Sequence, residues 1–502
     1  MTAMTTKKIF MLVFALSFVV AKLSGQQKPN IVYILADDMG YGDVGCYGQK
    51  QIRTPNIDAL ASAGMLFTQH YAGAPVCAPS RAVLMTGRNI GHASVRGNYE
   101  NGPFGFGAGL ELKDSDVTIG EVLKERGYTT AVIGKWGMGV KTTTGEPNKQ
   151  GFDYSYGFLN QGHAHYQFPE HLYRNGKRFE LPENKADGRK SYSNNLFTSE
   201  ALQFISNNKT KPFFLYLAYT TPHAELLVPN DSIFASYKGK FEENPFVKNK
   251  QGGAQSDNFG AYNSQQYPNA AYAACITHLD ICVGKLITSL KEQGLYENTL
   301  VIFTSDNGPS KEGGANPDYF SSSGGLRGKK RDVYEGGIRV PMIAVWPGKI
   351  KSGTTTNYIS CFQDVMPTLA EVSGRTLQKA VPTEGISFYP TLTGNSERQQ
   401  EHPYLYWEFH EGRTTSQAIR MGNWKVVRQA PDSTMEIYNL AIDLAEQTDV
   451  TAQQPALLKT FESLFKTART DHKLWPLKTS KDALTKKGKG KKGIAEAGIN
   501  AN

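Results

Sequence analysis

Two pairs of oxygen-bearing side chains stand directly after apolar runs in the sequence. Asp37 and Asp38 follow one run, and Asp306 and Asn307 follow another. If both runs are parallel strands, their carboxyl ends meet at one edge of a sheet, which is where ligands of such sheets bind. Carboxylate and amide oxygens brought together there suit calcium or magnesium, whereas zinc prefers nitrogen or sulfur. Either pair alone could equally cap a helix or a turn.

A third candidate is Cys77, which opens the run CAPSRAVLMTGR over residues 77–88. Pro79 can begin a helix in its first turn, and this would place Cys77 beside free backbone N–H groups that favour an anion. Arg81 would then lie within one turn of Cys77. A proline and an arginine at these fixed offsets from a cysteine are hard to explain by packing, so the run indicates a reactive site.

The run 77–88 resembles the signature of the type I, formylglycine-dependent sulfatases of the alkaline phosphatase superfamily. In that family the cysteine is oxidised after synthesis to formylglycine (3-oxoalanine), an aldehyde that hydrates to a geminal diol. The resemblance implies that residue 77 works as an oxygen group, after modification by a formylglycine-generating or sulfatase-maturating enzyme. It also implies a site for Ca²⁺ or Mg²⁺ whose ligands are Asp37, Asp38, the modified Cys77, Asp306 and Asn307.

Three further segments resemble the same family and supply polar groups. Lys135, in the sequence GKWG, ends a predicted strand and is a sulfate ligand by this resemblance. Lys330, in LRGKKRDVYEGGIRVP, matches the sulfate-binding lysine by register, although a solvated basic loop is the alternative. His223 follows a Thr-Pro pair and resembles the family's general acid, although a histidine near a strand end is commonly only a polar loop residue.

The resemblance implies a sulfuric ester hydrolase that cleaves sulfate monoesters. One hydroxyl of the hydrated residue 77 would attack sulfur while His223 protonates the departing oxygen, giving a covalent sulfo-enzyme. The second hydroxyl would then lose its proton, sulfate would depart, and the aldehyde would return. Since the ester is anionic and bond breaking adds charge to the leaving oxygen, cations must line such a pocket. The predicted cations are Arg81, which would hold the diol, Lys135 and Lys330.

Gly137 is a departure from the family pattern. Many sulfatases carry a histidine at this position, two residues after the lysine of the GKWG segment, and that histidine helps to hold the diol. His163 or His165 could occupy the space, or Arg81 could suffice alone. A metal site built on the His-x-His pair itself is disfavoured, because no cysteine or acidic residue stands at a useful spacing.

A sulfated carbohydrate is a better candidate substrate than a small aryl ester. Residues 141–200 and 225–268 are rich in Gly, Asn, Gln and Tyr, and such long polar loops suit glycan recognition. Among sulfatases with GKWG, a galactose-type sugar sulfated at the 4 position is the predicted substrate. Candidate stacking residues are Tyr99, Tyr166, Tyr406 and Trp407, although burial in the core is the more common role for any single one of them. Candidate contacts to sugar hydroxyls are Arg96, Asn98, His163, His165 and Glu408.

Two other functions remain open on the sequence. The same fold and the same modification also serve phosphodiester and phosphonate hydrolysis. From a different class, the chain could be an exported glycan-binding protein whose Cys77 is never modified.

The elements that must position these residues alternate along the chain. Short runs rich in Val, Ile, Phe and Tyr alternate with helical patterns, which predicts an α/β fold with a mainly parallel sheet sandwiched by helices. The resemblance implies the alkaline-phosphatase-like version of this fold. Predicted strands are 30–35, 130–134, 213–219, 300–304 and 340–346, and predicted helices are 56–63, 118–126 and 269–292.

From about residue 396 the sequence changes to short strand-like runs at 404–407, 418–420, 424–428 and 435–438. A predicted helix over 455–469 follows them. This predicts a smaller C-terminal subdomain with an antiparallel sheet. The expected division is a signal peptide over 1–25, a catalytic domain over 26–395, the subdomain over 396–477 and a basic disordered tail over 478–502. The leader has lysines before a short apolar run, the charge order of a secretory signal.

Charge and cysteine content narrow the partners. Most of the net charge of +9 lies in the leader and the tail, so the body is close to neutral and no nucleic-acid partner is expected. No later apolar run is expected to span a membrane, which predicts an exported protein, periplasmic or secreted. Besides Cys77 the cysteines are Cys46, Cys275, Cys282 and Cys361. Their spacing is typical of neither a zinc site nor a disulfide scaffold, so mostly buried free thiols are expected.

Overall fold

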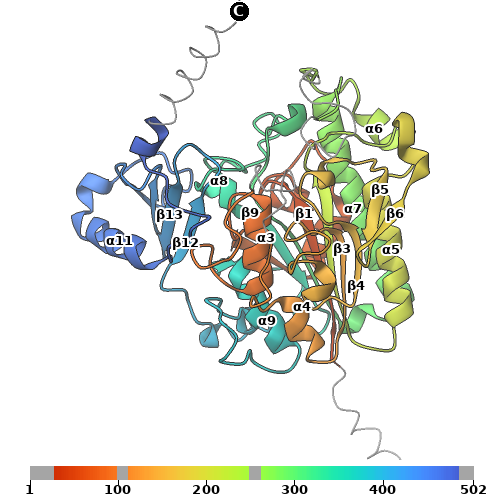
Figure 1. The fold of residues 1–502 in the computed structure, drawn as a ribbon, viewed down its shortest axis with the longest axis horizontal. Coiled ribbons are helices and arrows are strands. Elements are labelled where there is room, and N and C mark those ends of the chain that lie inside the picture. The colour runs from red at the N-terminus through yellow and green to blue at the C-terminus, as the bar shows by residue number, and fades with distance from the viewer. Residues whose placement is uncertain (1–27, 99–110, 248–261, 485–502) are drawn as a thin grey trace, which may run out of the picture.

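The computed structural model describes residues 28–98, 111–247 and 262–484, which form two sheets and the helices around them (Figure 1). The predicted signal peptide and most of the predicted tail lie outside the described residues. In Figure 1 the large sheet and its helices fill one part of the molecule, and a small sheet with α11 (Pro455–Thr467) lies at its side. The α/β architecture with a smaller antiparallel sheet, predicted from the sequence, is confirmed.

The large sheet has eleven strands in the order β10-β2-β9-β8-β1-β7-β3-β4-β5-β6, with β11 paired to β2. The central block β8-β1-β7-β3-β4 is parallel throughout. The strands are β1 (Asn30–Asp37), β2 (Met65–Tyr71), β3 (Thr129–Lys135), β4 (Tyr154–Phe158), β5 (His171–Arg174), β6 (Lys177–Glu180), β7 (Phe213–Pro222), β8 (Thr299–Ser305), β9 (Arg339–Val345), β10 (Thr354–Thr356) and β11 (Ser360–Cys361).

Helices cover both faces of this sheet because its strands are apolar on both sides. Along β1, Ile31, Tyr33 and Leu35 belong to one buried cluster, whereas Val32 and Ile34 belong to the other. The first face is covered by α3 (Cys77–Thr86), α4 (Ile119–Lys124) and α9 (Val365–Val372). The second face is covered by α2 (Pro55–Ala63), α5 (Ser193–Asn208) and α7 (Pro268–Glu292).

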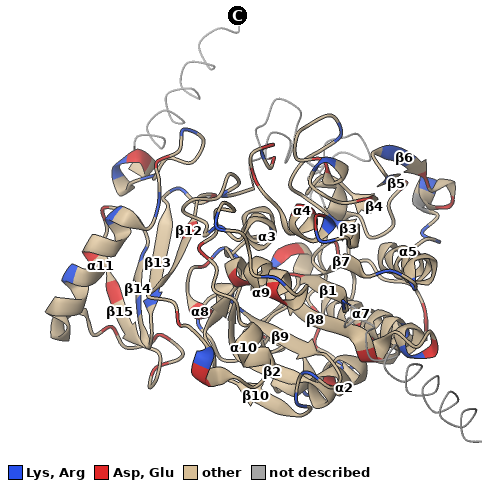
Figure 2. Cartoon of the chain, turned by 90° about the horizontal axis from the view of Figure 1, so that it is seen from below, with Lys and Arg blue, Asp and Glu red and all other residues tan. Residues whose placement is uncertain are grey.

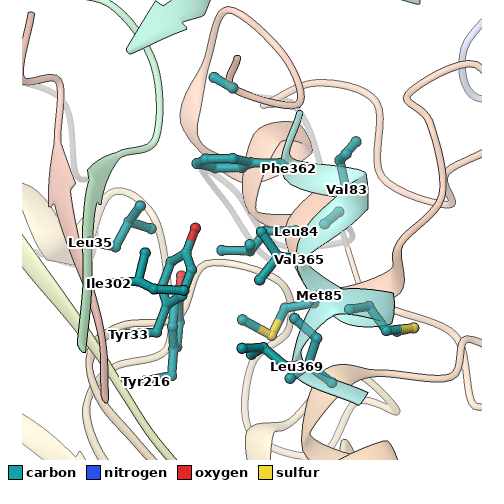
Figure 3. Packing of buried hydrophobic residues seen from close by; sticks show 14 of the residues in the cluster. Tyr33, Leu35, Val83, Leu84, Met85, Tyr216, Ile302, Phe362, Val365 and Leu369 are labelled. Atoms are coloured by element: carbon teal, nitrogen blue, oxygen red, sulfur yellow. The ribbon is translucent and has the colours of Figure 1, made fainter. Parts of the chain in front are cut away.

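The helix that begins at Cys77 is locked into the first face. Every residue of α3 is buried, and Figure 3 shows Leu84 and Met85 beside residues of α9, facing the side chains of the central strands. Gly87 ends the helix with a φ of 66°, the left-handed conformation that glycine adopts easily. Truncation of a buried leucine such as Leu84 to alanine costs about 2–5 kcal/mol. Tight packing therefore fixes where the first turn of α3 sits.

One long apolar helix lies inside the fold. Among the described residues, α7 is the helix whose length and composition would suffice to cross a bilayer. However, 83% of its most apolar window is buried inside the protein, and α7 packs on α5, on α2, on β7 and on α6 (Ser232–Tyr237). Core helices of large domains meet the same criteria, so α7 is a core helix here.

The small sheet joins β12 (Leu405–Phe409), β13 (Ser416–Met421), β14 (Trp424–Arg428) and β15 (Glu436–Asn439) in antiparallel order. Two further short α-helices are α8 (Glu335–Ile338) and α10 (Tyr389–Leu392). Residues 478–484, assigned to the tail by the sequence, are ordered in the structure. The backbone N–H of Thr415 donates to the Lys478 carbonyl, the backbone N–H of Lys478 donates to Oγ1 of Thr415, and residues 480–484 are helical.

The run 340–346 forms the predicted strand, β9, which is antiparallel to both of its neighbours, β8 and β2, in a sheet that is mainly parallel as predicted. One expectation about the large sheet is wrong. The segment 141–200 was expected to be a long polar loop, but it contains β4, β5 and β6, which extend the sheet. These strands are only four or five residues long, too short to show a clear alternation of polar and apolar residues.

The cysteine expectation holds for the described residues, and charged residues of both signs are mixed over them. Lysines and arginines are interspersed with acidic residues over both parts of the molecule (Figure 2). All five cysteines are free thiols in the structure, and four of them are buried, namely Cys77, Cys275, Cys282 and Cys361.

Candidate active site

The two oxygen-bearing pairs of the sequence meet at one edge of the large sheet. The parallel strands β1 and β8 end in register, with Ala36 opposite Ser305, so Asp37 and Asp306 leave the sheet side by side. Asp38 then turns the chain with a φ of 65°, which is uncommon outside glycine. Its backbone N–H donates to Oδ1 of Asp306 at 3.1 Å and holds this turn.

Asn307 completes the cluster and leaves one atom without a partner. Its Nδ2 donates to Oδ1 of Asp38 at 2.7 Å. Its Oδ1 is buried and has no hydrogen-bond partner among the residues that the structure describes. A buried polar atom without a partner is costly unless a ligand satisfies it. Together with the neighbouring carboxylates of Asp37, Asp38 and Asp306, this amide oxygen forms a donor set that fits a hard divalent cation.

Cys77 lies against the same carboxylates. It is the first residue of α3, as the sequence predicts, and its Sγ lies 3.3 Å from Oδ1 of Asp37 and 3.9 Å from Oδ1 of Asp38. Ligand atoms of these three residues and of His223 all fall within 4.8 Å of one another. Residue 77 is therefore placed to contact a cation bound by the carboxylates.

The Cys77 thiol itself is a poor nucleophile in this setting. Burial raises its pKa well above the usual range, and the negative charge of Asp37 raises it further. The thiolate, not the thiol, is the reactive form of cysteine. The side chain therefore stays protonated at neutral pH.

Three buried cations surround the carboxylates. Lys135, at the end of β3, places Nζ 2.6 Å from Oδ2 of Asp37. Lys330 places Nζ 2.8 Å from Oδ2 of Asp38. Arg81, one turn into α3, donates through Nε to Oδ2 of Asp306 at 2.9 Å and through NH1 to the Lys135 carbonyl at 2.8 Å. Arg81 thus fastens the helix that carries Cys77 to the strand end that carries Lys135.

The carboxyl groups respond to these charges in opposite directions. Burial alone would raise the pKa of Asp37, but Lys135, His223 and Arg81 together hold it well below its usual range. Burial and the neighbouring charge of Asp37 raise the pKa of Asp306, and Arg81 offsets only part of this. Additional positive charge at the cluster would stabilise the ionised form of Asp306.

His223 faces this cluster through its Nε2. That atom lies 3.5 Å from Oδ2 of Asp38 and 3.4 Å from Oε2 of Glu312, while Nδ1 contacts the Ala224 carbonyl. Because a carbonyl only accepts hydrogen bonds, Nδ1 carries a proton and Nε2 is the atom that exchanges one. Burial, followed by the charge of Lys330, lowers the pKa of His223 to about 3, so the imidazole is neutral in the free protein.

Glu312 is a member of the site that sequence reasoning missed. It accepts a hydrogen bond from Lys330 through Oε2 at 2.8 Å and one from Arg331 through Oε1 at 2.8 Å. It lies in an irregular glycine-containing segment after β8. No periodic pattern or motif marks this position, so only the folded structure brings it to His223 and Lys330.

A side chain at Gly137 would require a strained backbone and a shift of Gln161. The φ of this glycine is 77°, and a Cβ there would lie 2.1 Å from Nε2 of Gln161. The Gln161 amide therefore fills the space beside this glycine. Of the two histidines expected near it, His165 stacks on His223 with ring centroids 4.6 Å apart, whereas His163 packs against Phe158 and His171.

The predicted sugar contacts divide into two groups. Asn98 lies at the site, because its Oδ1 accepts the backbone N–H of Ala78 at 3.2 Å. Arg96 and Glu408 instead form a buried ion pair with each other, at 3.5 Å, and Glu408 also pairs with Arg469 at 3.0 Å. Tyr166 is partly buried, and Tyr99 lies outside the described residues.

Trp407 and Tyr406 are core residues. Trp407 is fully buried and donates through Nε1 to the Ala72 carbonyl at 2.9 Å. The hydroxyl of Tyr406 donates to Oε2 of Glu408 at 2.6 Å, also in the interior. A sugar cannot stack on either ring in this arrangement, so the stacking prediction is wrong for both. An aromatic residue in a strand packs on the core more often than on a ligand.

Comparison with known families assigns most of the chain. Residues 29–374 match the family Sulfatase, and residues 328–470 match a family described as "N-sulphoglucosamine sulphohydrolase, C-terminal". The first match contains every residue of the cluster around Cys77. The second covers the segment from Gly328 through the small sheet.

Individual relatives are similar over most of their length. The N-acetylgalactosamine-6-sulfatase of Mus musculus is 30% identical over 420 residues, covering 80% of this chain and 72% of that protein. Arylsulfatase A of Homo sapiens is 34% identical over 418 residues, covering 81% and 76%. The crystal structure of Ps i-CgsB in complex with k-i-k-neocarrahexaose superposes with a TM-score of 0.73 at 30% identity, covering 91% of this chain and 96% of that one.

Proposed function

The chain belongs to the sulfatase family, and we propose that it removes sulfate from a sulfated carbohydrate by way of a formylglycine formed from Cys77. One observation carries this proposal. The buried residue 77 lies beside oxygen ligands suited to a divalent cation, and the same ligands contact Lys135, Lys330 and His223. As a thiol this residue is unreactive, because burial raises its pKa. A hydrated aldehyde at the same position would supply the attacking oxygen without a thiolate.

The metal ligands of the proposal are Asp37, Asp38, Asp306 and Asn307, with the oxygen of the modified residue 77. A bound Ca²⁺ or Mg²⁺ would supply positive charge that stabilises anionic oxygens of the nucleophile and of the sulfate. The orphan Oδ1 of Asn307 and the raised pKa of Asp306 support a cation at this place.

The two lysines supply the sulfate-binding charge. Lys135 contacts Asp37 and Lys330 contacts Asp38, and both of these carboxylates lie beside Cys77. Both ammonium groups are buried, with side chains 0% and 3% exposed. Because water is excluded, each would stabilise a sulfate oxygen strongly. Arg81 would hold residue 77 in place through the start of α3.

His223 is the proposed general acid for the departing sugar oxygen. Its Nε2 lies between the buried Asp38 and the more exposed Glu312. In the free protein the ring is neutral because burial lowers its pKa. An anionic sulfate ester bound nearby would favour the protonated ring. The stacked ring of His165 would hold the imidazole in this orientation.

The proposed substrate is a galactose-type sugar sulfated at the 4 position. The resemblance at GKWG, residues 134–137, supports the sugar and the position. Similarity to an N-acetylgalactosamine-6-sulfatase and to a structure solved with a neocarrahexaose supports a carbohydrate as the substrate. Export to the periplasm or the medium, through the leader over residues 1–25, fits a polymeric substrate outside the cell.

One experiment tests the proposal against its rivals. The protein would be produced with a formylglycine-generating enzyme and assayed on matched sulfate and phosphate esters and on a regioisomeric panel of sulfated monosaccharides. Hydrolysis of sulfate but not phosphate esters, with the galactose 4-sulfate preferred, is the expected result. Faster phosphate hydrolysis would favour the phosphodiesterase alternative. Binding of glycans without turnover would favour the binding protein, and preference for glucosamine sulfates would refute the proposed sugar.

A further inference from the structure

The rim of the site carries an arginine between two glutamates. The NH2 of Arg331 donates to Oε1 of Glu312 at 2.8 Å, and its Nε lies 3.6 Å from Oε2 of Glu411. The side chains of Arg331, Glu312 and Glu411 are 42%, 22% and 19% exposed. Those of Lys330 and His223 are only 3% and 2% exposed. Among the described residues, these three are therefore more exposed to solvent than the buried Lys330 and His223.

Separate elements hold this rim against the nucleophile. Arg331 has a φ of 78°, and its backbone N–H donates to the Pro75 carbonyl at 2.8 Å, two residues before Cys77. Glu411 follows β12 of the small sheet. Its Oε1 accepts the backbone N–H of Asn98 at 2.8 Å, and Asn98 in turn caps Ala78. The rim is thus fixed to both sides of residue 77.

The side chains of Arg331 and Glu411 both keep polar atoms that make no hydrogen bond among the described residues. At 3.6 Å the contact between Arg331 and Glu411 is an ion pair without a hydrogen bond. Among the described residues, NH2 is the one nitrogen of the Arg331 side chain that donates a hydrogen bond. Likewise, Oε2 of Glu411 accepts none within that part of the chain. A guanidinium only donates and a carboxylate only accepts, so together they suit hydroxyl groups, which do both.

We propose that Arg331 and Glu411 bind the hydroxyl groups of the sugar that carries the scissile sulfate, and that they favour a sugar whose other substituents are uncharged. This inference rests on the proposed function. At the rim Arg331 carries one positive charge, whereas Glu312 and Glu411 carry two negative charges. The rim therefore has no surplus cation for a second sulfate or a carboxylate on the same sugar.

The test compares a sulfated sugar with an ester that lacks hydroxyl groups. Arg331→Gln and Glu411→Gln are assayed on the preferred monosulfated galactose and on 4-nitrophenyl sulfate. Glutamine at 411 keeps an oxygen for the Asn98 N–H. The control is Lys329→Gln, a neighbouring cation that pairs with Asp318 at 2.6 Å, outside the rim.

Each rim variant is expected to lower kcat/KM on the sugar about 10-fold to 100-fold, mainly through KM, since it loses a charge-assisted hydrogen bond. On 4-nitrophenyl sulfate it should stay within about 2-fold of the unmutated protein, as the control should on both substrates. Equal losses on both substrates would overturn the inference, because Arg331 would then act only by fixing Glu312 and Lys330. Unchanged kinetics on the sugar would overturn it as well. Failure of the unmutated protein on both esters would instead refute the proposed function.

The charge balance gives a second readout. The unmutated protein should prefer the monosulfated sugar to the same sugar with an adjacent second sulfate, and Glu411→Gln should narrow that preference by removing a negative charge. Preference of the unmutated protein for the disulfated sugar would overturn the charge argument.

Discussion

The thiol sulfur of Cys77 lies 3.3 Å from Oδ1 of Asp37, although 40 residues separate them in the sequence. The helix start at Cys77 and the end of β1 are held in this contact by Arg81, whose guanidinium reaches Asp306 and the Lys135 carbonyl. A modified side chain at residue 77 would therefore lie against the same carboxylates without rearrangement of the core.

Replacement of Lys330 should cost far more activity than replacement of its neighbour Lys329. Lys330 is buried against Asp38 and Glu312, so Lys330→Ala removes a desolvated sulfate ligand. The expected loss in kcat/KM on a sulfate ester is about 100-fold to 1,000-fold. Lys329→Ala, which removes a lysine paired with Asp318, should change it less than about 3-fold. Equal losses in the two variants would show that the register assigning Lys330 is wrong.

The role of His223 is tested by the leaving group. A general acid matters most when the departing oxygen is a poor leaving group. His223→Gln should therefore reduce kcat on a sulfated sugar by about 100-fold to 10,000-fold, yet reduce it much less on 4-nitrophenyl sulfate, whose phenolate departs without help. His171→Gln, in the cluster around His163, serves as the control. If both esters slow by the same factor, His223 has another role.

Cation binding should stabilise the protein without any assay of activity. Chelator-treated protein is expected to gain melting temperature when Ca²⁺ is added, with a stabilisation of about 2.7 kcal/mol at 100 times the dissociation constant. Asp306→Asn and Asn307→Ala should abolish this shift, because each removes a proposed ligand. Asp318→Asn, an exposed acid outside the site, should keep it. A shift that persists in both ligand variants would place the cation elsewhere.

A further prediction, independent of the active site, concerns pH and stability. His402 is partly buried and pairs through Nε2 with Oδ1 of Asp364 at 2.7 Å. Burial alone would lower its pKa, but Asp364 outweighs burial and raises it above 6.5. The pair therefore adds stability that is fully present below pH 6.5 and is lost as pH rises through the folded-state pKa.

The variant His402→Gln should accordingly be less stable by about 1–3 kcal/mol at pH 6, and the difference should shrink towards pH 9. Urea unfolding at a series of pH values measures it. A difference that grows with pH would contradict the raised pKa.

Much of the site could be predicted because it lies where regular elements end. Asp37, Asp38, Asp306 and Asn307 follow apolar strands whose register brings their ends together. Cys77 begins a helix that its own sequence marks. Such positions need only the rule that ligands gather at the carboxyl ends of parallel strands.

The rest of the site and of the fold depends on contacts that no local sequence pattern predicts. Glu312 and Glu411 lie in irregular segments and reach the site only through the packing of the fold. Trp407 was one candidate for stacking on a sugar, but it is fully buried and its indole donates a hydrogen bond to the Ala72 carbonyl in the core. The short strands β4, β5 and β6 are stabilised by joining the edge of a sheet, and their sequence alone does not indicate them.

The central claim is that residue 77 acts as an aldehyde-derived oxygen group. The most direct measurement is the mass of the peptide that spans residue 77, taken from protein of known sulfatase activity. The account predicts a peptide about 18 Da lighter than its sequence mass, with the lighter fraction proportional to activity, and a folded but inactive Cys77→Ala variant. Full activity in protein whose residue 77 is entirely an unmodified thiol would contradict it.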